Sequence, residues 1–268
     1  MTKTILITGA TDGIGLETAH KLVSLGHRVL LHGRNAAKLE ALREELTTLG
    51  TGATFESYQC DLSNFDEVIT FATAVANNHS SLDVLINNAG VFKTSNPNNS
   101  DGLDIRFAVN TIAPYLLTKR LMPLLGTTAR VVNLSSAAQS PVDPEALIGS
   151  RAISETQAYA QSKLALTMWS RAMALSLGGK GPSIIAVNPG SMLGTKMVKE
   201  AYGVTGGDVQ VGADILTRAA LSDEFTDASG KYFDNDSGQF ASPHRDALDS
   251  AKCNTVVRLI EAIIAQAS

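Results

Sequence analysis

Cysteine is scarce in this sequence, with only Cys60 and Cys253 among 268 residues. Two cysteines cannot form a disulfide framework, and these two show neither a C-x-x-C motif nor the spacing of zinc ligands. The five histidines form no metal-like cluster in the sequence, so we expect no metal site. A chain of this length buries enough surface to fold without such cross-links.

Long apolar runs and an excess of positive charge are also missing. No apolar stretch approaches the roughly 20 residues that span a bilayer. The strand-like segment Thr4-Ile5-Leu6-Ile7 begins too early to leave room for a signal peptide. The net charge is −4, whereas nucleic-acid-binding proteins usually carry a basic surface. These features predict a cytoplasmic protein with neither nucleic-acid nor membrane partners.

Apolar runs of strand length alternate with segments of helical periodicity along the whole chain. The expected strands cover residues 3–8, 28–32, 54–60, 83–87, 130–134, 183–187 and 231–233. The expected helices cover residues 13–25, 35–49, 64–78, 101–125, 154–177, 209–221 and 245–266. We expect a loop around Pro141 and Pro144 and an irregular, flap-like segment at 191–207. The alternation predicts an α/β fold with a Rossmann-like, doubly wound parallel sheet of about seven strands, with helices on both faces, as a single domain over residues 1–268.

A glycine-rich loop connects the first strand to the first helix. Its sequence is Thr8-Gly9-Ala10-Thr11-Asp12-Gly13-Ile14-Gly15. Glycines let the backbone approach a pyrophosphate, and the start of the following helix attracts the anion. The loop lacks the G-x-x-x-x-G-K-[ST] pattern, which disfavours a P-loop nucleotidase. The pattern predicts that a dinucleotide binds to Gly9, Thr11, Asp12, Gly13, Ile14 and Gly15, and the alternative is an ordinary glycine-rich turn.

This loop resembles the T-G-x-x-x-G-x-G motif of the short-chain dehydrogenase/reductase family, in its smaller, non-extended branch. Other family motifs follow in the same order, over about residues 3–235: Asn87-Asn88-Ala89-Gly90, Asn110, Ser136, Tyr159-Ala160-Gln161-Ser162-Lys163 and Pro189-Gly190. The resemblance implies an NAD(P)(H)-dependent oxidoreductase that interconverts an alcohol and a ketone or aldehyde by hydride transfer. It also implies a small-molecule substrate and a homodimer or homotetramer formed through the two long central helices.

The resemblance further implies which residues line the cofactor site beyond the glycine loop: Asp61, Leu62, Asn88, Ala89, Gly90, Pro189 and Gly190. Asp61 would accept a hydrogen bond from the adenine amino group, and its alternative role is a solvated helix cap. The family often shows P-G-x-x-x-T, with the threonine on the nicotinamide carboxamide. Here the spacing is one residue longer, so Thr195 and Ser191 compete for that role.

Tyr159 and Lys163 are four residues apart on an expected helix and therefore share one face. A nearby ammonium lowers the pKa of a phenol, which is ordinarily about 10. Proton transfer is most efficient when the pKa of the acid or base lies near the working pH. Tyrosine beside lysine therefore suits proton exchange with an alcohol or ketone, and we expect Tyr159 to be the catalytic acid/base. By resemblance, Ser136 binds and polarises the substrate carbonyl, and Lys163 also bonds the nicotinamide ribose. Ser135 is expected to be a structural turn residue.

The end of the second expected strand, His32-Gly33-Arg34, predicts the choice of cofactor. An NAD site usually has a carboxylate near this strand end, about 20 residues after the glycine loop. Gly33 takes that position, and the guanidinium of Arg34 is suited to binding a phosphate. We therefore expect NADP(H) to be favoured over NAD(H). Asp12 is a complication, because many NADP-dependent members carry a basic residue there.

Pro114 follows Asn110 by four residues within an expected helix. Proline has no amide hydrogen, so the Asn110 carbonyl should be free and the helix should bend there. By resemblance, the family uses this asparagine to hold a water that connects the active-site lysine to solvent. These points predict a proton relay from Tyr159 through the ribose and Lys163 to a water on Asn110. The alternative is a kink that only improves packing.

Other functions remain open at this stage. The segment Ser229-Gly230-Lys231-Tyr232-Phe233 weakly resembles retinol-dehydrogenase-like members and hints at an apolar substrate, although an edge strand would explain it more simply. One alternative is a catalytically idle dinucleotide sensor or scaffold, which the intact serine, tyrosine and lysine disfavour. Another is a small sugar-nucleotide epimerase or dehydratase, which the short chain and the NNAG segment disfavour.

Overall fold

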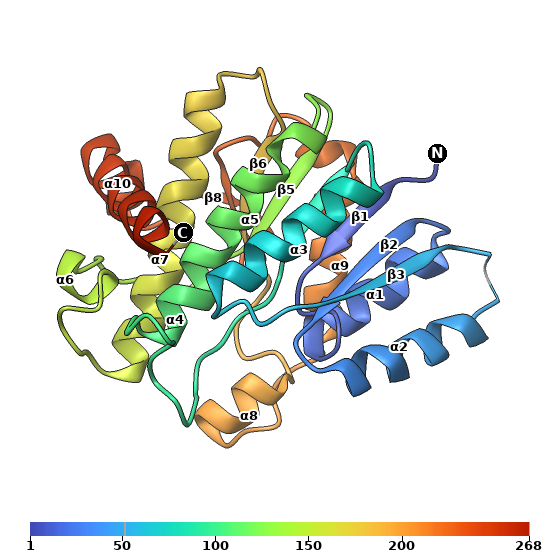
Figure 1. Cartoon of the computed structure of the whole chain (residues 1–268), viewed down its shortest axis with the longest axis horizontal. Helices are drawn as coiled ribbons and strands as arrows, with labels where there is room; N and C mark the ends of the chain where they lie inside the picture. Colours follow the sequence, from blue (N-terminus) through green and yellow to red (C-terminus); the bar gives the residue numbers. More distant parts are fainter. Residues whose placement is uncertain (51, 268) are drawn as a thin grey trace.

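The computed structural model describes residues 1–50 and 52–267 of the chain. Within these residues, eight strands form one sheet in the order β3-β2-β1-β4-β5-β6-β7-β8 (Figure 1). Only the last pair, β7 with β8, is antiparallel. The strands are β1 (Thr4–Ile7), β2 (Arg28–Gly33), β3 (Phe55–Gln59), β4 (Val84–Asn87), β5 (Arg130–Leu134), β6 (Ser183–Asn188), β7 (Tyr232–Asp234) and β8 (Gln239–Ala241). The predicted fold class is confirmed, and β8 is the strand that the prediction missed.

Helices cover both faces of the sheet. Successive strand residues point to opposite faces, so the apolar strand residues form a packing surface for helices on each face. Ile5 and Ile7 of β1 lie in one apolar cluster, and Leu6 lies in the other. The first cluster includes residues of α1 (Gly13–Ser24), α2 (Ala36–Thr48) and α9 (Gln210–Leu221). The second includes residues of α3 (Phe65–Asn78), α5 (Ala113–Leu121), α7 (Glu155–Leu177) and α10 (Ser250–Ala267).

Side-chain caps start three of these helices where the sequence predicts them. Asn35 accepts a hydrogen bond from the Lys38 amide at the start of α2, and Asn64 caps α3 in the same way. At α7, Ser154 and Gln157 form a reciprocal capping box. These local bonds fix the points at which the chain leaves the strand ends and enters the helices.

The long, bent helix predicted over residues 101–125 begins only at Ile105 and is divided into several turns. The segment contains α4 (Ile105–Phe107), a π-helical turn η1 (Ala108–Ile112), α5, and a 3₁₀ turn η2 (Met122–Leu124). Pro114 lies at the start of α5 and cannot donate a helical bond, so the preceding turn widens, with the Ala113 amide bonded to the Ala108 carbonyl. The irregularity expected at Asn110 is therefore present as a π turn, while a free Asn110 carbonyl stays a prediction.

Three other segments also differ from the expectation. The flap predicted to be irregular contains α8 (Lys196–Tyr202), which Thr195 caps and which ends at Gly203 with φ 69°. The loop around Pro144 contains α6 (Pro144–Leu147), and the segment 245–266 divides into a 3₁₀ turn η4 (Arg245–Leu248) and α10. A further 3₁₀ turn, η3 (Asp223–Phe225), follows α9. Short helices of four to seven residues carry too little periodicity to be recognised in the sequence.

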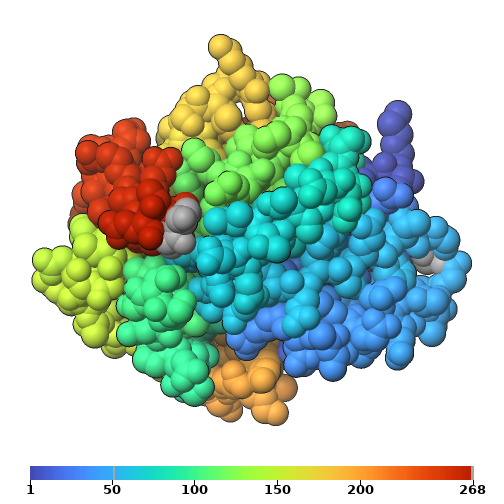
Figure 2. Space-filling view, in the orientation of Figure 1, coloured from blue at the N-terminus to red at the C-terminus, as the bar shows by residue number. Residues whose placement is uncertain are grey.

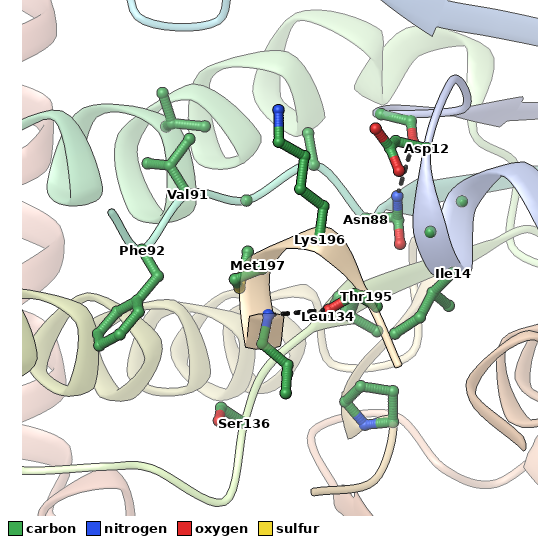
Figure 3. A pocket seen from close by; sticks show the side chains of 18 of the residues that line it. Asp12, Ile14, Asn88, Val91, Phe92, Leu134, Ser136, Thr195, Lys196 and Met197 are labelled. Atoms are coloured by element: carbon green, nitrogen blue, oxygen red, sulfur yellow. Dashed lines mark hydrogen bonds between the residues drawn. The ribbon is translucent and has the colours of Figure 1, made fainter. Parts of the chain in front are cut away.

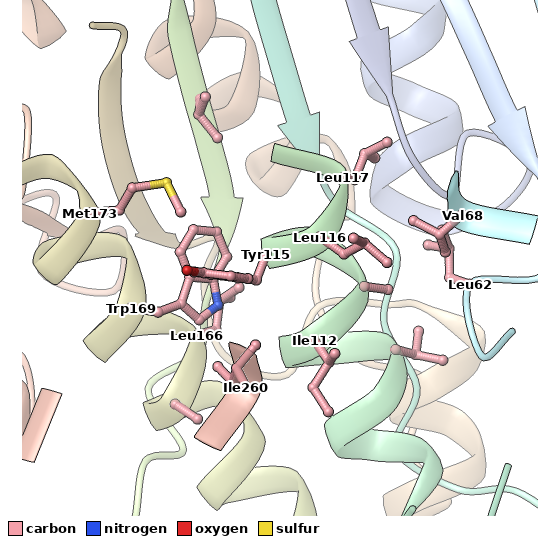
Figure 4. Close-up of a cluster of buried hydrophobic side chains, with 14 of the residues drawn as sticks. Leu62, Val68, Ile112, Tyr115, Leu116, Leu117, Leu166, Trp169, Met173 and Ile260 are labelled. Carbon is pink, nitrogen blue, oxygen red and sulfur yellow. The ribbon is translucent and has the colours of Figure 1, made fainter. Parts of the chain in front are cut away.

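The C-terminal helix α10 packs against the outer side of α7 and α5 (Figures 1 and 2). Ile260 is fully buried beside Tyr115 and Trp169 (Figure 4), whose rings meet edge to face at 5.5 Å. The Tyr115 hydroxyl donates to Glu261 Oε1 at 2.7 Å. The helix thus covers part of the α5 and α7 surface within the chain itself.

We expect Ile260→Ala to lower the free energy of unfolding by about 2–5 kcal/mol, because it leaves a cavity under α10. Urea unfolding followed by the fluorescence of Trp169, the only tryptophan, measures this loss. Leu175→Ala is the control: Leu175 is 58% exposed on α7, and its truncation should change the free energy by no more than about 0.5 kcal/mol. Equal losses in the two variants would contradict the packing of α10.

Candidate active site

A cavity of about 720 Å³ lies at the carboxyl ends of the strands (Figure 3). The structure brings all but one of the predicted site residues into its wall: Gly9, Thr11, Asp12, Gly13, Ile14, Gly15, Arg34, Asp61, Leu62, Asn88, Ala89, Gly90, Ser136, Tyr159, Lys163, Pro189, Gly190 and Thr195. The exception is Asn110, which lies directly behind Gly90. Its Oδ1 is 3.4 Å from the point where a Cβ on Gly90 would lie.

The glycine loop brings the start of α1 to the cavity without a side-chain cap. Asp12 is the N-cap residue of α1, but its side chain makes no capping hydrogen bond. Gly9 and Gly13 have φ values of 68° and 53°, a region that favours glycine, and a Cβ on Gly15 would lie 2.1 Å from the Gly9 carbonyl oxygen. Helix amides without a side-chain cap are suited to binding an anion. The loop therefore fits the pyrophosphate of a dinucleotide.

Two side chains hold this loop against the neighbouring strand ends. Asn88 Nδ2 donates to the carbonyls of Thr8 and Gly9 at 2.9 and 3.1 Å. Burial lowers the pKa of His32 to about 4, so its ring is neutral, with Nδ1 accepting from the Gly9 amide and Nε2 donating to the Cys60 carbonyl. The ends of β1, β2, β3 and β4 are thus joined around the loop.

Charged side chains gather where β2 ends. Arg34 is exposed at the rim of the cavity, and Lys38, one helical turn later, donates to Asp12 Oδ2 at 2.8 Å. A Cβ on Gly33 would lie 2.8 Å from Thr11 Cγ2, so a larger residue there would have to displace the Thr11 side chain. Sequence reasoning missed Lys38, although its four-residue spacing from Arg34 was a usable signal. Its ion pair also balances the charge of Asp12.

Ser136, Tyr159 and Lys163 come together in the cavity. The Ser136 hydroxyl lies near the Tyr159 phenol, and Lys163 Nζ lies 5.8 Å from the centre of the Tyr159 ring. Burial raises the pKa of Tyr159, and the nearby Ser136 hydroxyl opposes this only in part. The expectation that Lys163 lowers the pKa of the phenol is wrong for the chain alone. The ammonium donates instead to the Leu134 carbonyl at 2.7 Å, and burial lowers its own pKa to about 8.

The neighbouring polar residues serve as connections between elements. Ser135 is buried, and its Oγ lies 2.6 Å from Thr167 Oγ1, which agrees with the structural role expected for it. Asn110 accepts from the Val91 amide at 2.8 Å and donates to the Val91 carbonyl and to Ser162 Oγ, both at 3.0 Å. The Asn110 side chain therefore joins the segment after β4 to α7.

The flap over the cavity is held at its base. Ser191 donates from its amide and its hydroxyl to Asp236, at 2.7 and 2.6 Å, so this hydroxyl already has a strong acceptor. Leu193 and Gly207 form a bridge that closes the base. Thr195 Oγ1 caps α8 by accepting from Val198, and its methyl group lies over Gly13. Asp236 was not predicted, and nothing in its local sequence singles it out.

Aromatic side chains cover the predicted catalytic residues. The Phe92 ring meets Tyr159 edge to face at 4.8 Å and stacks on Tyr202 of α8 at 6.0 Å. Sequence reasoning missed both residues, although Phe92 comes only two residues after the NNAG segment. The same part of the wall carries Val91, Met192, Met197 and Val198. Apolar side chains therefore surround Tyr159 on this side, while Lys93, Lys196 and Glu200 also line the cavity.

Within residues 1–50 and 52–267, no three histidine, cysteine, aspartate or glutamate side chains come together in a group that could hold a metal. In the same residues, no helix is both long and apolar enough to cross a membrane.

Comparison with known proteins identifies the family. Residues 3–203 match the family model described as short chain dehydrogenase, so the chain belongs to this family of oxidoreductases, whose members bind NAD(P). Human retinol dehydrogenase 13 is 30% identical over 251 residues, which cover 87% of this chain and 76% of that protein.

Solved structures agree with this membership. An uncharacterised protein from Mycobacterium paratuberculosis has a TM-score of 0.81 and 27% identity, over 98% of this chain and 93% of its own. A metagenomic short-chain oxidoreductase in complex with NADP has a TM-score of 0.62 and 31% identity, over 81% of this chain and 90% of its own. The protein is thus a short-chain dehydrogenase/reductase enzyme.

The lowered pKa of Lys163 predicts how stability depends on pH. Its pKa falls from 10.5 to about 8 on folding, so below about pH 8 a buried ammonium destabilises the native state, by on the order of 3 kcal/mol. This cost decreases as the pH rises from 8 to 10.5, because the native state has then lost the proton. Lys163→Met should therefore stabilise the protein relative to wild type more at pH 7 than at pH 10.

Urea unfolding at the two pH values measures this difference in stability. Lys180→Met, which replaces an exposed lysine, is the control, and its difference from wild type should be the same at both. A Lys163→Met variant whose advantage grows between pH 7 and pH 10 would show that the sign is wrong.

Proposed function

We propose that the protein interconverts an alcohol and a ketone or aldehyde by hydride transfer, with NADP(H) as the favoured cofactor. One observation carries the proposal: Ser136, Tyr159 and Lys163 face the same cavity as the uncapped start of α1. The chemistry that a nicotinamide supplies is the hydride. The chain then has to orient the carbonyl and provide the proton.

The side chains suit a division of these tasks. The Ser136 hydroxyl lies in the cavity wall near the Tyr159 phenol, where it can donate to a substrate oxygen. Since burial raises the pKa of Tyr159, the phenol is protonated at neutral pH and can give its proton to the developing alkoxide. Lys163, with a pKa of about 8, can change its protonation state near working pH and would also bond the nicotinamide ribose.

A proton relay through Asn110 is part of this proposal. Asn110 Oδ1 and Lys163 Nζ both lie next to Gly90, 3.4 and 3.5 Å from the position of a Cβ there. Asn110 also lies in the π turn that Pro114 imposes. Both points support a route in which a water bonded to the Asn110 carbonyl exchanges protons with Lys163.

The other residues of the wall would hold the cofactor. The Asp61 carboxylate is fixed by the Ser63 amide and hydroxyl at 2.9 and 2.8 Å, and it would accept a bond from the adenine amino group. Asp236 already engages Ser191, which favours Thr195 as the residue near the carboxamide. The remaining contacts would come from the glycine loop and from Leu62, Asn88, Ala89, Gly90, Pro189 and Gly190.

The preference for NADP(H) rests on two cations at the end of β2. Arg34 and Lys38 both line the rim, and the 2′-phosphate of NADP would meet them there. Gly33 takes the position where NAD sites carry a carboxylate, and a side chain there would press on Thr11. The similarity to a metagenomic short-chain oxidoreductase solved with NADP supports the same preference.

An apolar alcohol or carbonyl compound is the substrate class that the cavity favours. Its mouth carries Phe92, Met192 and Tyr202, and the similarity to retinol dehydrogenase 13 points the same way. An idle dinucleotide sensor remains the alternative. The presence of Ser136, Tyr159 and Lys163 together in the cavity wall argues against it, because a sensor has no use for a proton donor at the cofactor site.

The single domain, the cytoplasmic location and the homo-oligomer stay predictions. All strands of the described residues share one sheet, which supports one domain. The oligomer has less support, since α10 already covers part of the α5 and α7 surface that a partner would use.

Tyr159→Phe should lower turnover by about 10²–10⁴-fold, because it removes the proton-carrying oxygen. NADPH affinity should remain close to that of wild type. A panel of apolar ketones and aldehydes, followed by NADPH oxidation, measures turnover, and fluorescence titration measures the affinity. Tyr58→Phe, outside the cavity wall, is the control. Near-normal turnover by Tyr159→Phe would remove Tyr159 as the proton donor.

Arg34→Ala and Lys38→Ala should each weaken NADPH binding by about 10–100-fold, the range for a charge-assisted bond. NADH binding should change little, because NADH has no 2′-phosphate. Arg43→Ala, an exposed change farther along α2, is the matched control. Equal losses for NADPH and NADH in both variants would refute the assignment of the phosphate to these cations.

A further inference from the structure

Arg106 carries a positive charge that has no role in the cavity wall or in the proposed chemistry. It lies in α4, is only 1% exposed, and is not part of the cavity wall. A guanidinium cannot lose its proton in a protein, so the charge stays on the buried side chain. A buried charge is tolerated only when it is paired and fully hydrogen-bonded.

The guanidinium bonds three separate segments. Its Nε donates to the Phe92 carbonyl at 2.7 Å. Its Nη1 donates to both oxygens of Asp104, at 3.2 and 3.0 Å, and Nη2 donates to Glu155 Oε1 at 2.7 Å. The two carboxylates neutralise the charge, while the Nε bond holds a backbone carbonyl next to the cavity.

Asn110, one helical turn after Arg106, holds the adjacent residue. It bonds both the amide and the carbonyl of Val91, at 2.8 and 3.0 Å. The two side chains therefore hold three backbone groups of the Val91–Phe92 segment, which lies along the cavity wall (Figure 3). Both also bond α7, Arg106 through Glu155 and Asn110 through Ser162, on either side of Tyr159 in the sequence.

The Phe92 ring is what this segment presents to the active site. The ring packs edge to face on Tyr159, and only 7% of Phe92 is exposed. The polar groups that face Tyr159 are the Ser136 hydroxyl, the Tyr202 phenol and Lys163, whose Nζ lies 5.8 Å from the ring centre. Phe92 supplies an apolar contact on the ring of Tyr159, a residue that is otherwise half-buried in the cavity wall.

We propose that Arg106 is a positioning residue: by binding the Phe92 carbonyl it holds the Phe92 ring against Tyr159 and limits the access of water to the proton donor. The inference rests on the proposed function, because it concerns the residue assigned there as proton donor. A lysine cannot replace the arginine, since its single nitrogen cannot reach the Phe92 carbonyl and both carboxylates at once.

Arg106→Lys keeps the charge but loses the planar fork, and it tests the proposal directly. We expect kcat/KM for carbonyl reduction to fall about tenfold as the site loosens. The falling limb of its pH profile should move about half a unit toward lower pH, because water then reaches a phenol whose pKa burial had raised. A limb that stays at its wild-type position would overturn the proposal.

Glu155→Gln is the matched control, since it weakens the ionic network but leaves the bond from Arg106 to Phe92. The falling limb of its pH profile should stay at the wild-type pH. A shift as large as that of Arg106→Lys would show that only general stability matters. Phe92→Leu provides the second variant, which does not depend on whether Arg106→Lys folds. It should shift the limb in the same direction, and the double variant should add little to it. An unshifted limb in Phe92→Leu, or additive shifts, would also refute the proposal.

Hydrogen exchange separates this proposal from the proposed function. If the wild type reduces none of the carbonyls tested, the proposed function fails, and the amides of the Val91–Phe92 segment still report on Arg106. Mass spectrometry of a peptide covering residues 88–95 should show faster exchange in Arg106→Lys than in Glu155→Gln. Equal exchange in the two variants would mean that Arg106 does not hold the segment.

Discussion

At the junction of β1 and β4, Asn88 donates to the carbonyls of Thr8 and Gly9, while the Thr8 hydroxyl accepts from the amides of Asn88 and Ala89. These bonds link two central strands at the point where each ends. The glycine loop follows β1 at this junction, and residues 90–92, which line the cavity, follow β4. Because the junction is buried, each lost bond would leave an unsatisfied polar group, so both walls of the cavity depend on it.

Burial decides the charge state of the groups around this junction. His32 stays neutral, and the phenol of Tyr159 stays protonated, because the charged forms would lose their contact with water. The same cost lowers the pKa of Lys163 to about 8. Arg106 cannot respond in this way, and it is accommodated only because two carboxylates and a carbonyl surround it. The site thus combines groups that can change their charge with one that cannot.

The residues that close the site come from distant parts of the chain. Tyr202 of α8 stacks on Phe92, which follows β4, and Phe92 packs on Tyr159 of α7. Arg106 in α4 and Asn110 in the π turn hold the backbone that carries Phe92. The contacts among these aromatic rings therefore form only in the tertiary structure, and the position of each ring depends on the positions of the others.

The sequence by itself determined the features that rest on short-range rules. Alternating apolar segments predict the parallel sheet, and the caps Asn35, Asn64 and Ser154 mark three helix starts because their bonds span only two or three residues. The motif residues lie just after the strands, and parallel strands bring them to one edge. This is why nearly all of the predicted site residues line one cavity.

Only the tertiary structure decided the features that depend on contacts between distant residues. The pairing of Lys38 with Asp12 and the bond from Arg106 to Phe92 join residues whose spacing follows no short repeat. The direction in which the pKa of Tyr159 shifts was also predicted wrongly. The four-residue spacing correctly placed Lys163 beside the ring, but the depth of burial and the bond to Leu134 outweigh that proximity. Periodicity reports which face a residue occupies, whereas burial and long-range partners exist only once the elements have packed.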